Sequence, residues 1–146
     1  MIKYKTREEI ELMRESAQLV SKTLGMLAPK IVPGAIPLEL DKMAEEFIRD
    51  HGGEPGFLGM YGFPNSLCMS PNAQVVHGIP GKDPLKEGDI LSVDCGVYMN
   101  EFYGDHAYTF AVAERVIPGP LLAPESESVT ITLTAPNPID AGDYVN

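Results

Sequence analysis

Two aspartates, Asp94 and Asp105, stand in neighbouring segments that the sequence predicts to be the strands of one hairpin. Residues 90–99 and about 102–112 are rich in β-branched and aromatic residues, and residues 100–101 separate them. A two-residue turn at that point fixes which positions of the two strands pair. The hairpin is therefore the first place to look for chemistry.

This pairing places Asp94 opposite Ala107 and Gly96 opposite Asp105. Side chains two positions apart on a strand share a face, so the two aspartates lie diagonally on one face, with backbones about 5–8 Å apart. Two carboxylates on a buried sheet face repel each other unless a positive charge lies between them. Because oxygen ligands favour hard divalent ions, the spacing predicts a metal site.

Two other interpretations of the aspartate pair are compatible with the spacing. In the first, that face of the hairpin is solvated and Asp94 and Asp105 have no shared role. In the second, the two carboxyl groups form an acid–base pair that works without metal. The spacing alone does not decide between these interpretations and a metal site.

The chain has three histidines, which the pattern places differently. His77 ends a predicted short strand, residues 74–77, that the turn at 78–81 terminates. A lone histidine of this kind is more often a hydrogen-bonded core residue than a catalyst. His106 falls on the hairpin face opposite Asp105, and His51 lies at a helix C-terminus, where the helix dipole favours it.

Two amphipathic helices precede the hairpin. The first begins with a capping box at residues 6–9 and ends before Pro29. The second runs roughly over residues 38–51, whereas residues 54–72 are predicted to be a loop because turn residues are frequent there. The predicted buried stripes are Ile10, Met13, Ala17, Val20, Leu24 and Leu27 on the first helix, and Leu40, Met43, Ala44, Phe47 and Ile48 on the second.

The composition and charge of the chain argue against several classes of function. The chain has 146 residues and a formal charge of −10, with 11 basic against 21 acidic residues. An acidic surface repels phosphate backbones and anionic lipids, so we expect no nucleic-acid or membrane partner. No segment approaches the ~18 apolar residues of a membrane span, and no secretion signal is apparent. With only two cysteines, expected to be free and buried, we expect a cytoplasmic protein.

The chain divides into two parts by composition, 1–110 and 111–146. The second part is a proline-rich tail that carries a single basic residue, Arg115. Its middle, residues 128–134, alternates with a period of two and predicts one strand.

Several collinear segments carry a resemblance to a known family. They are residues 5–14, 62–68, 76–80, 88–97 and 102–110. On these segments, residues 1–110 resemble the N-terminal half of a type 1 methionine aminopeptidase. The resemblance implies an α+β fold, a partial pita-bread fold with an antiparallel sheet and two helices on one face. It also implies metal-dependent removal of N-terminal methionine from peptides or nascent proteins.

The resemblance further implies roles for particular residues. Asp94 and Asp105 would bind divalent metal (manganese, iron, cobalt or zinc), which activates the attacking water. His77 would be a catalytic residue that hydrogen-bonds the substrate. The residues implied in the methionine pocket are Phe57, Met60, Tyr61, Phe63 and Cys68.

The tail departs from the family pattern, which draws a further histidine and two glutamates as metal ligands from its second half. The tail contains no histidine. This leaves two other hypotheses: a non-catalytic module that binds peptides, or an inactive fragment on the aminopeptidase scaffold. Because the family fold has two pseudo-symmetric halves, a further hypothesis is that the tail strand, or a second copy in a homodimer, covers the face that the second half covers.

Overall fold

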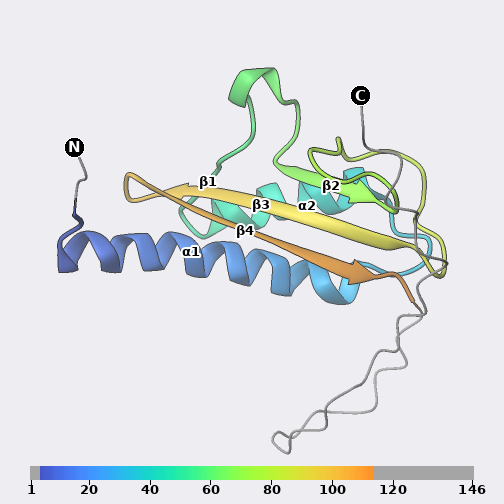
Figure 1. Ribbon diagram of the computed structural model, residues 1–146, viewed down its shortest axis with the longest axis horizontal. Helices are drawn as coiled ribbons and strands as arrows, with labels where there is room; N and C mark the ends of the chain where they lie inside the picture. The colour runs from blue at the N-terminus through green and yellow to red at the C-terminus, as the bar shows by residue number, and fades with distance from the viewer. Residues whose placement is uncertain (1–3, 114–146) are drawn as a thin grey trace, which may run out of the picture. The chain divides into compact units, whose positions relative to one another are not determined.

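The predicted hairpin supplies the two long strands of an antiparallel sheet (Figure 1). In the computed structural model, which describes residues 4–113, β4 pairs along one side of β3, and the two shorter strands pair along the other. All of these elements belong to one compact unit, Met1–Val116. The strands are β1 (Glu54–Pro55), β2 (Leu67–Pro71), β3 (Ile90–Met99) and β4 (Phe102–Ala111).

The register of the hairpin is the one that the two-residue turn predicts. Asp94 pairs with Ala107, and Gly96 pairs with Asp105. The turn residues, Asn100 and Glu101, both adopt left-handed backbone conformations, with φ of 55° and 67°. Positive φ at both central positions is the geometry of the tight hairpin turns that match the twist of the strands. The turn therefore fixes which side chains share a face.

The first helix, α1 (Arg7–Leu27), begins with the predicted capping box. The Thr6 Oγ1 accepts the Glu9 amide at 3.1 Å, and the Glu9 carboxylate accepts the Thr6 amide at 2.7 Å. A short 3₁₀ helix, η1 (Ala28–Lys30), ends it, and the second helix, α2 (Pro37–Asp50), follows. Both predicted helices are thus confirmed, with ends within one or two residues of those expected.

Both helices pack on the same face of the sheet, which confirms the predicted α+β arrangement. The core lies between the helices and the sheet. Alternate residues of β3 contribute to this core, and the residues between them project from the opposite face of the sheet. The fully buried members of this core are Val20, Leu27, Ile31, Ala44, Ile48, Leu67, Leu91, Val93, Cys95 and Val97.

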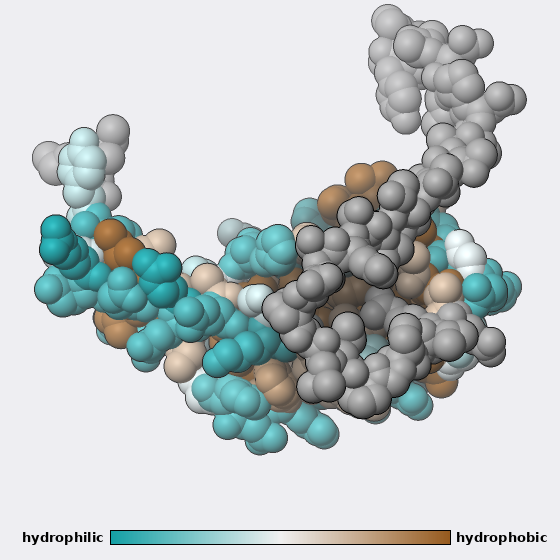
Figure 2. All heavy atoms as spheres, turned by 90° about the horizontal axis from the view of Figure 1, so that it is seen from below, coloured by the Kyte–Doolittle hydropathy of each residue, from teal (hydrophilic) through white to brown (hydrophobic). Residues whose placement is uncertain are grey.

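Three residues of the predicted helical stripes are exposed, and two others, Met13 and Phe47, are only partly buried. Ile10 is 44% exposed, and Ala17 and Met43 are exposed as well. Figure 1 shows the first turns of α1 extending past the β3–β4 turn, beyond the sheet that would cover them. In the space-filling view, this end of the helix is mostly hydrophilic with a few hydrophobic residues among the others (Figure 2). The buried face of α1 is instead built on Ser16, Leu19, Val20, Thr23, Leu24 and Leu27.

The prediction of a strand over residues 74–77 is wrong. The segment forms no strand, and Val75 and Val76 are 83% and 62% exposed, with no sheet neighbour to pair with. The prediction of a loop over 54–72 is also wrong in part, because it contains β1 and β2. The turn-forming residues Pro64, before β2, and Pro71, at its end, made the segment look like a loop, although Leu67, Met69 and Ser70 are buried.

The predicted tail strand at residues 128–134 lies outside the described residues, and the division at residue 110 remains a prediction. Among residues 4–113, neither α-helix is long and apolar enough to cross a lipid bilayer.

Candidate metal centre and cavity

Asp94 and Asp105 lie on the sheet face opposite the helices. Asp94 projects from β3, where it pairs with Ala107 of β4 and with Cys68 of β2. Asp105 pairs with Gly96, two residues along β3 from Asp94, so the two carboxylates share this face. Both line one cavity. The structure thus brings together the two aspartates that the sequence placed diagonally.

The environment of Asp94 favours a cation. Burial raises the pKa of the Asp94 carboxyl above its ordinary value, and the negative charge of Asp105 raises this pKa further. The Oδ1 atom of Asp94 is buried, and no described residue hydrogen-bonds to it. A buried carboxylate oxygen without a partner is costly, and a bound cation would remove that cost. In charge and in donor type, the pair fits a divalent metal ion.

The ligand set is incomplete within residues 4–113, which hold no group of three or more His, Cys, Asp or Glu side chains placed to bind one metal ion. The two aspartates are therefore part of a site and not a whole one. Additional donors would have to come from outside this part of the chain, from the substrate or from water.

The cavity in front of the aspartates has a volume of about 530 Å³. Its wall is mainly apolar, and the charged and polar groups that line it are Cys68, His77, Asp94 and Asp105, together with the Tyr61 hydroxyl. A pocket of this kind, in which apolar walls surround a few polar groups, is typical of sites for small ligands or side chains. The predicted site residues that line it are Phe57, Met60, Tyr61, Phe63, Cys68, His77, Asp94 and Asp105, and the sequence analysis missed Gly62, Pro64 and Ile79.

A tight loop around η2 (Met60–Gly62) builds one wall of the cavity. The Gly59 amide donates to the carbonyl of Phe63 at 2.8 Å, which closes the loop on itself. Gly59, Tyr61 and Gly62 all have positive φ, and Tyr61 is fully exposed at the edge of the cavity. Non-glycine residues rarely adopt this conformation, so Tyr61 marks a constrained point of the wall.

Phe57 lies directly on the sheet beside the aspartates. A Cβ atom on Gly96 would lie 2.5 Å from Cε1 of the Phe57 ring. The Gly56 amide also donates to the carbonyl of Gly96 at 2.8 Å, which fixes the chain next to Phe57. Phe57 therefore reaches its place only because position 96, opposite Asp105, carries no side chain.

His77 reaches the cavity from a segment that is not a strand. Its φ is 58°, in the left-handed region, and its side chain lines the cavity with the two aspartates. Histidine is one of the residues that tolerate this conformation better than β-branched residues do. His106 faces the other side of the sheet, beside α1, as predicted, and the His51 Nδ1 lies 2.7 Å from the carbonyl oxygen of Phe47.

Cys68 lines the cavity but is a poor nucleophile. Burial raises the pKa of its thiol to about 11, and the charges of Asp94 and Asp105 act in the same direction. The thiol therefore stays protonated near neutral pH. Cys68 and Cys95 are both free and buried. Cys68 thus serves as a small apolar part of the wall.

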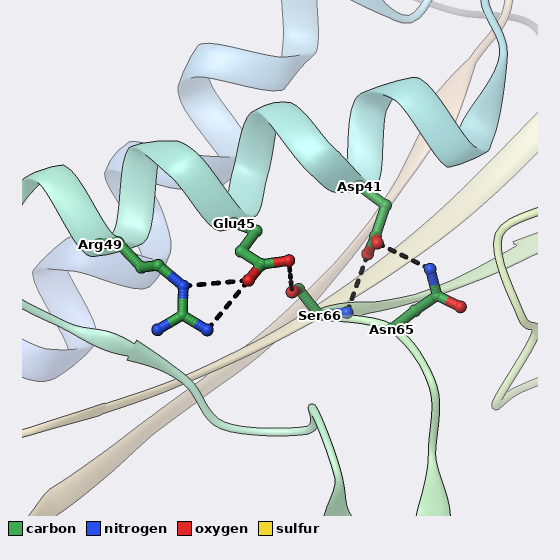
Figure 3. A network of polar contacts seen from close by, with 5 residues as sticks. All are labelled: Asp41, Glu45, Arg49, Asn65 and Ser66. Atoms are coloured by element: carbon green, nitrogen blue, oxygen red, sulfur yellow. Dashed lines mark hydrogen bonds and ion pairs between the residues drawn. The ribbon is translucent and has the colours of Figure 1, made fainter.

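A buried carboxylate fastens the end of the cavity loop to α2. Asp41 accepts hydrogen bonds from the Asn65 side chain at 2.8 Å and from the Ser66 amide at 3.0 Å (Figure 3). It also accepts one from the Leu67 amide at 2.8 Å. Glu45 accepts the Ser66 hydroxyl at 3.2 Å. The sequence analysis missed Asp41, although an acidic residue at helical spacing from Ala44 and Ile48 indicates a buried acid.

The sequence pattern of metallopeptidase family M24 matches residues 11–135. The chain belongs to this family. It is 53% identical over 112 residues to a methionine aminopeptidase of Clostridium perfringens, a match that covers 77% of this chain and 45% of that protein. It is 46% identical over 112 residues to methionine aminopeptidase 1 of Bacillus subtilis, with the same coverage of 77% and 45%. The resemblance seen in the sequence is thus confirmed.

The fold is also that of solved methionine aminopeptidases. The structure from Thermotoga maritima has a TM-score of 0.75 at 38% identity and covers 78% of this chain and 46% of that chain. The structure from Rickettsia prowazekii has a TM-score of 0.76 at 35% identity, with the same coverage of 78% and 46%. A prolidase from Pyrococcus furiosus, with a TM-score of 0.62 at 19% identity, shares the fold alone. The predicted partial pita-bread fold is therefore confirmed.

The chain spans about half the length of the relatives it matches: 45% of the Clostridium perfringens protein and 46% of the Thermotoga maritima chain. The matching half carries the aspartate pair and the cavity.

Proposed function

We propose that the chain acts in the metal-dependent removal of N-terminal methionine from peptides or nascent proteins. The observation that carries the proposal is that Asp94, Asp105 and His77 line one mainly apolar cavity. Methionine aminopeptidases at up to 53% identity give the substrate class. The cavity offers what an N-terminal methionine needs, namely an apolar wall beside a cation site.

In this proposal Asp94 and Asp105 hold divalent metal, with manganese, iron, cobalt and zinc as the candidates for these ligands. When bound, such an ion would act as a Lewis acid and would lower the pKa of a water molecule that serves as the nucleophile for the scissile carbonyl. The unpartnered Oδ1 of Asp94 is the atom that gains most from a cation. Without a cation, the negative charges of the two carboxylates repel each other.

The cavity wall then binds the methionine side chain. Aromatic rings and sulfur atoms suit an unbranched thioether, which fills irregular apolar space. His77, on the same cavity as the two aspartates, hydrogen-bonds the substrate near the scissile bond. The wall residues assigned to methionine are Phe57, Met60, Tyr61, Phe63 and Cys68.

A second candidate function is a non-catalytic module that binds N-terminal methionine. The observation that favours it is the incomplete ligand set, because residues 4–113 contain no group of three or more His, Cys, Asp or Glu side chains placed to hold one metal ion. Such a module binds methionine peptides but releases no product. An inactive fragment would do neither.

A homodimer is the partner arrangement that we propose, because a second copy is one source of additional ligands. Among residues 4–113, β4 pairs only with β3, so its other edge is open to a second chain. Sedimentation velocity with and without metal tests this arrangement, and a monomeric mass under both conditions removes it. We place the protein in the cytoplasm, where buried thiols such as Cys68 and Cys95 stay reduced.

The test is release of methionine from a Met-Ala-Ser peptide during titration with Mn²⁺ or Co²⁺. The enzyme proposal expects metal-dependent release that Asp105→Ala abolishes, whereas Asp50→Asn on the surface of α2 leaves it unchanged. Peptide binding without release at any metal concentration supports the binding module. If the chain neither binds the peptide nor releases methionine, both proposed functions are contradicted.

A further inference from the structure

The backbone of residue 78 is fastened directly to β2. The Met69 amide donates to the carbonyl of Gly78 at 2.8 Å, and the Gly78 amide donates to the Ser70 Oγ at 3.0 Å. The contact is close enough that a Cβ atom on Gly78 would lie 2.0 Å from the carbonyl oxygen of Met69. Only glycine fits at this position, and the two hydrogen bonds fix it there.

Ser70 lies on the same side of the sheet as the metal centre. It is two residues from Cys68, so the two side chains share a face, and Cys68 pairs with Asp94. Ser70 is 3% exposed, and its hydroxyl is the acceptor for the Gly78 amide. The residue that this hydroxyl holds, Gly78, lies between two residues that line the cavity, His77 and Ile79. The Ser70 hydroxyl therefore has a role beyond filling space.

That cavity residue is His77. Its left-handed backbone, with φ of 58°, is unfavourable for a residue with a Cβ atom and persists only where the surroundings hold it. Val75 and Val76, on its N-terminal side, are largely exposed. Among the described residues, the only hydrogen bonds that join 75–78 to the rest of the chain are the two at Gly78.

We propose that Ser70 is a positioning residue for His77: its hydroxyl holds the Gly78 amide, and thereby keeps the His77 imidazole in the cavity beside Asp94 and Asp105. The bond to the Met69 amide orients the carbonyl of Gly78 but leaves its amide free to rotate away. Ser70 completes the attachment. The inference rests on the proposed function, in which His77 contacts the substrate.

The first measurement is the activity of variants in methionine release. Ser70→Ala removes the acceptor and lowers kcat/KM on the order of 10-fold to 100-fold, the usual cost of misplacing a catalytic group by about 1 Å. The matched control is Ser92→Ala, which removes a hydroxyl from the residue paired with Ser70 and leaves activity at the parent level. Ser70→Thr, which keeps a hydroxyl, restores most of the activity.

A double-variant comparison separates positioning from general loss of structure. If Ser70 acts through His77, Ser70→Ala has little further effect in a His77→Ala background, because the group it positions is gone. A purely structural role for Ser70 predicts that the two losses multiply. Equal independent losses in both backgrounds therefore overturn the proposal.

The second measurement needs no activity. Amide hydrogen exchange followed by NMR reports on the bond itself, and Ser70→Ala accelerates exchange of the Gly78 amide by about tenfold or more, as expected for loss of one protecting hydrogen bond. The Leu67 amide, which Asp41 holds, keeps its rate and serves as the internal control. If Ser70→Ala loses its cooperative melting transition, Ser70→Cys, whose thiol is a weak acceptor, takes its place.

The outcomes distinguish this inference from the proposed function. If His77→Ala lowers activity and Ser70→Ala leaves both activity and Gly78 exchange unchanged, the positioning role is wrong and the function stands. If the parent protein releases no methionine, the proposed function fails, and unchanged Gly78 exchange in Ser70→Ala then overturns the positioning as well. If the Gly78 amide exchanges faster in Ser70→Ala while the Leu67 amide keeps its rate, the positioning role is supported.

Discussion

The carboxylate of Asp41, on α2, accepts the amide hydrogen of Leu67, the first residue of β2, at 2.8 Å. The same carboxylate accepts the Ser66 amide at 3.0 Å, at the point where the cavity loop returns to the sheet. Asp41 is almost fully buried. Because β2 carries Cys68 to the cavity, this contact couples the position of a helix to the position of the cavity wall.

Asp41→Ala is expected to destabilise the protein by roughly 3 kcal/mol, because it leaves two buried amides and the Asn65 side chain without their acceptor. Urea unfolding followed by circular dichroism measures the loss. Glu46→Ala, at an exposed position of the same helix, is the control and is expected to change stability by less than about 0.5 kcal/mol. Equal stability of the two variants would show that the Asp41 contacts contribute nothing.

Asp94→Asn is expected to stabilise the metal-free protein at pH 7. The pKa of Asp94 is raised in the folded state by burial and then by Asp105, so the folded state binds more protons than the unfolded state above pH ~4. The contribution of Asp94 to stability is therefore fully present below its unfolded pKa and is lost as the pH rises through the folded pKa. The neutral amide has no such loss.

Thermal unfolding in EDTA at pH 5 and pH 7 measures this effect. From pH 5 to pH 7, the melting temperature of the parent is expected to fall relative to that of Asp94→Asn. Asp50→Asn is the control for removal of one surface charge. Adding Mn²⁺ at pH 7 reverses the order, because the metal binds only the folded parent. A lower melting temperature of Asp94→Asn in EDTA at pH 7 is the result that contradicts the burial argument.

The sequence was sufficient to predict the hairpin, its register and the shared face of Asp94 and Asp105. These follow from local rules: a two-residue turn sets the register, and the register sets the faces. Both helices were also predicted, because their apolar spacing is repeated over several turns. The capping box at Thr6 and Glu9 gave the start of α1 to within one residue.

Other parts of the fold depend on contacts that no local pattern records. The strand β2 follows Pro64 closely and ends at Pro71, and only its pairing with β3 and its bonds to Asp41 identify it. Val75 and Val76 have the composition of a strand, but the sheet offers no partner there. His77 therefore reaches the cavity through a loop held by Ser70 and Gly78, a tertiary arrangement that spacing does not reveal.

Gly96→Ala is expected to destabilise the protein by about 1–3 kcal/mol, because the new methyl group overlaps the ring of Phe57. The double variant Gly96→Ala with Phe57→Ala is expected to recover part of the loss, since the clashing ring is absent. The control is Gly25→Ala on α1, which meets no atom within 4 Å and is expected to raise stability by about 0.5–1 kcal/mol. Thermal unfolding of the parent, Gly96→Ala, Phe57→Ala and their double variant measures the coupling.

If Gly96→Ala is as stable as the parent, the Phe57 ring can adopt another position without cost. The cavity wall beside Asp105 is then not fixed by packing on the sheet. The proposed methionine pocket would then have to form on substrate binding. A large coupling between positions 57 and 96 instead supports a wall that exists before the substrate arrives.

Glu101→Gly is expected to stabilise the protein by about 0.5–1 kcal/mol, because Glu101 has a φ of 67° that glycine adopts without steric cost. The gain is limited because glycine also increases the conformational entropy of the unfolded chain. Glu101→Ala is the control: it removes the same carboxylate but keeps the Cβ atom, and it is expected to give no comparable gain. Since this turn sets the register that brings Asp94 and Asp105 to one face, a destabilised Glu101→Gly variant would mean that the hairpin is held by its strands and not by its turn.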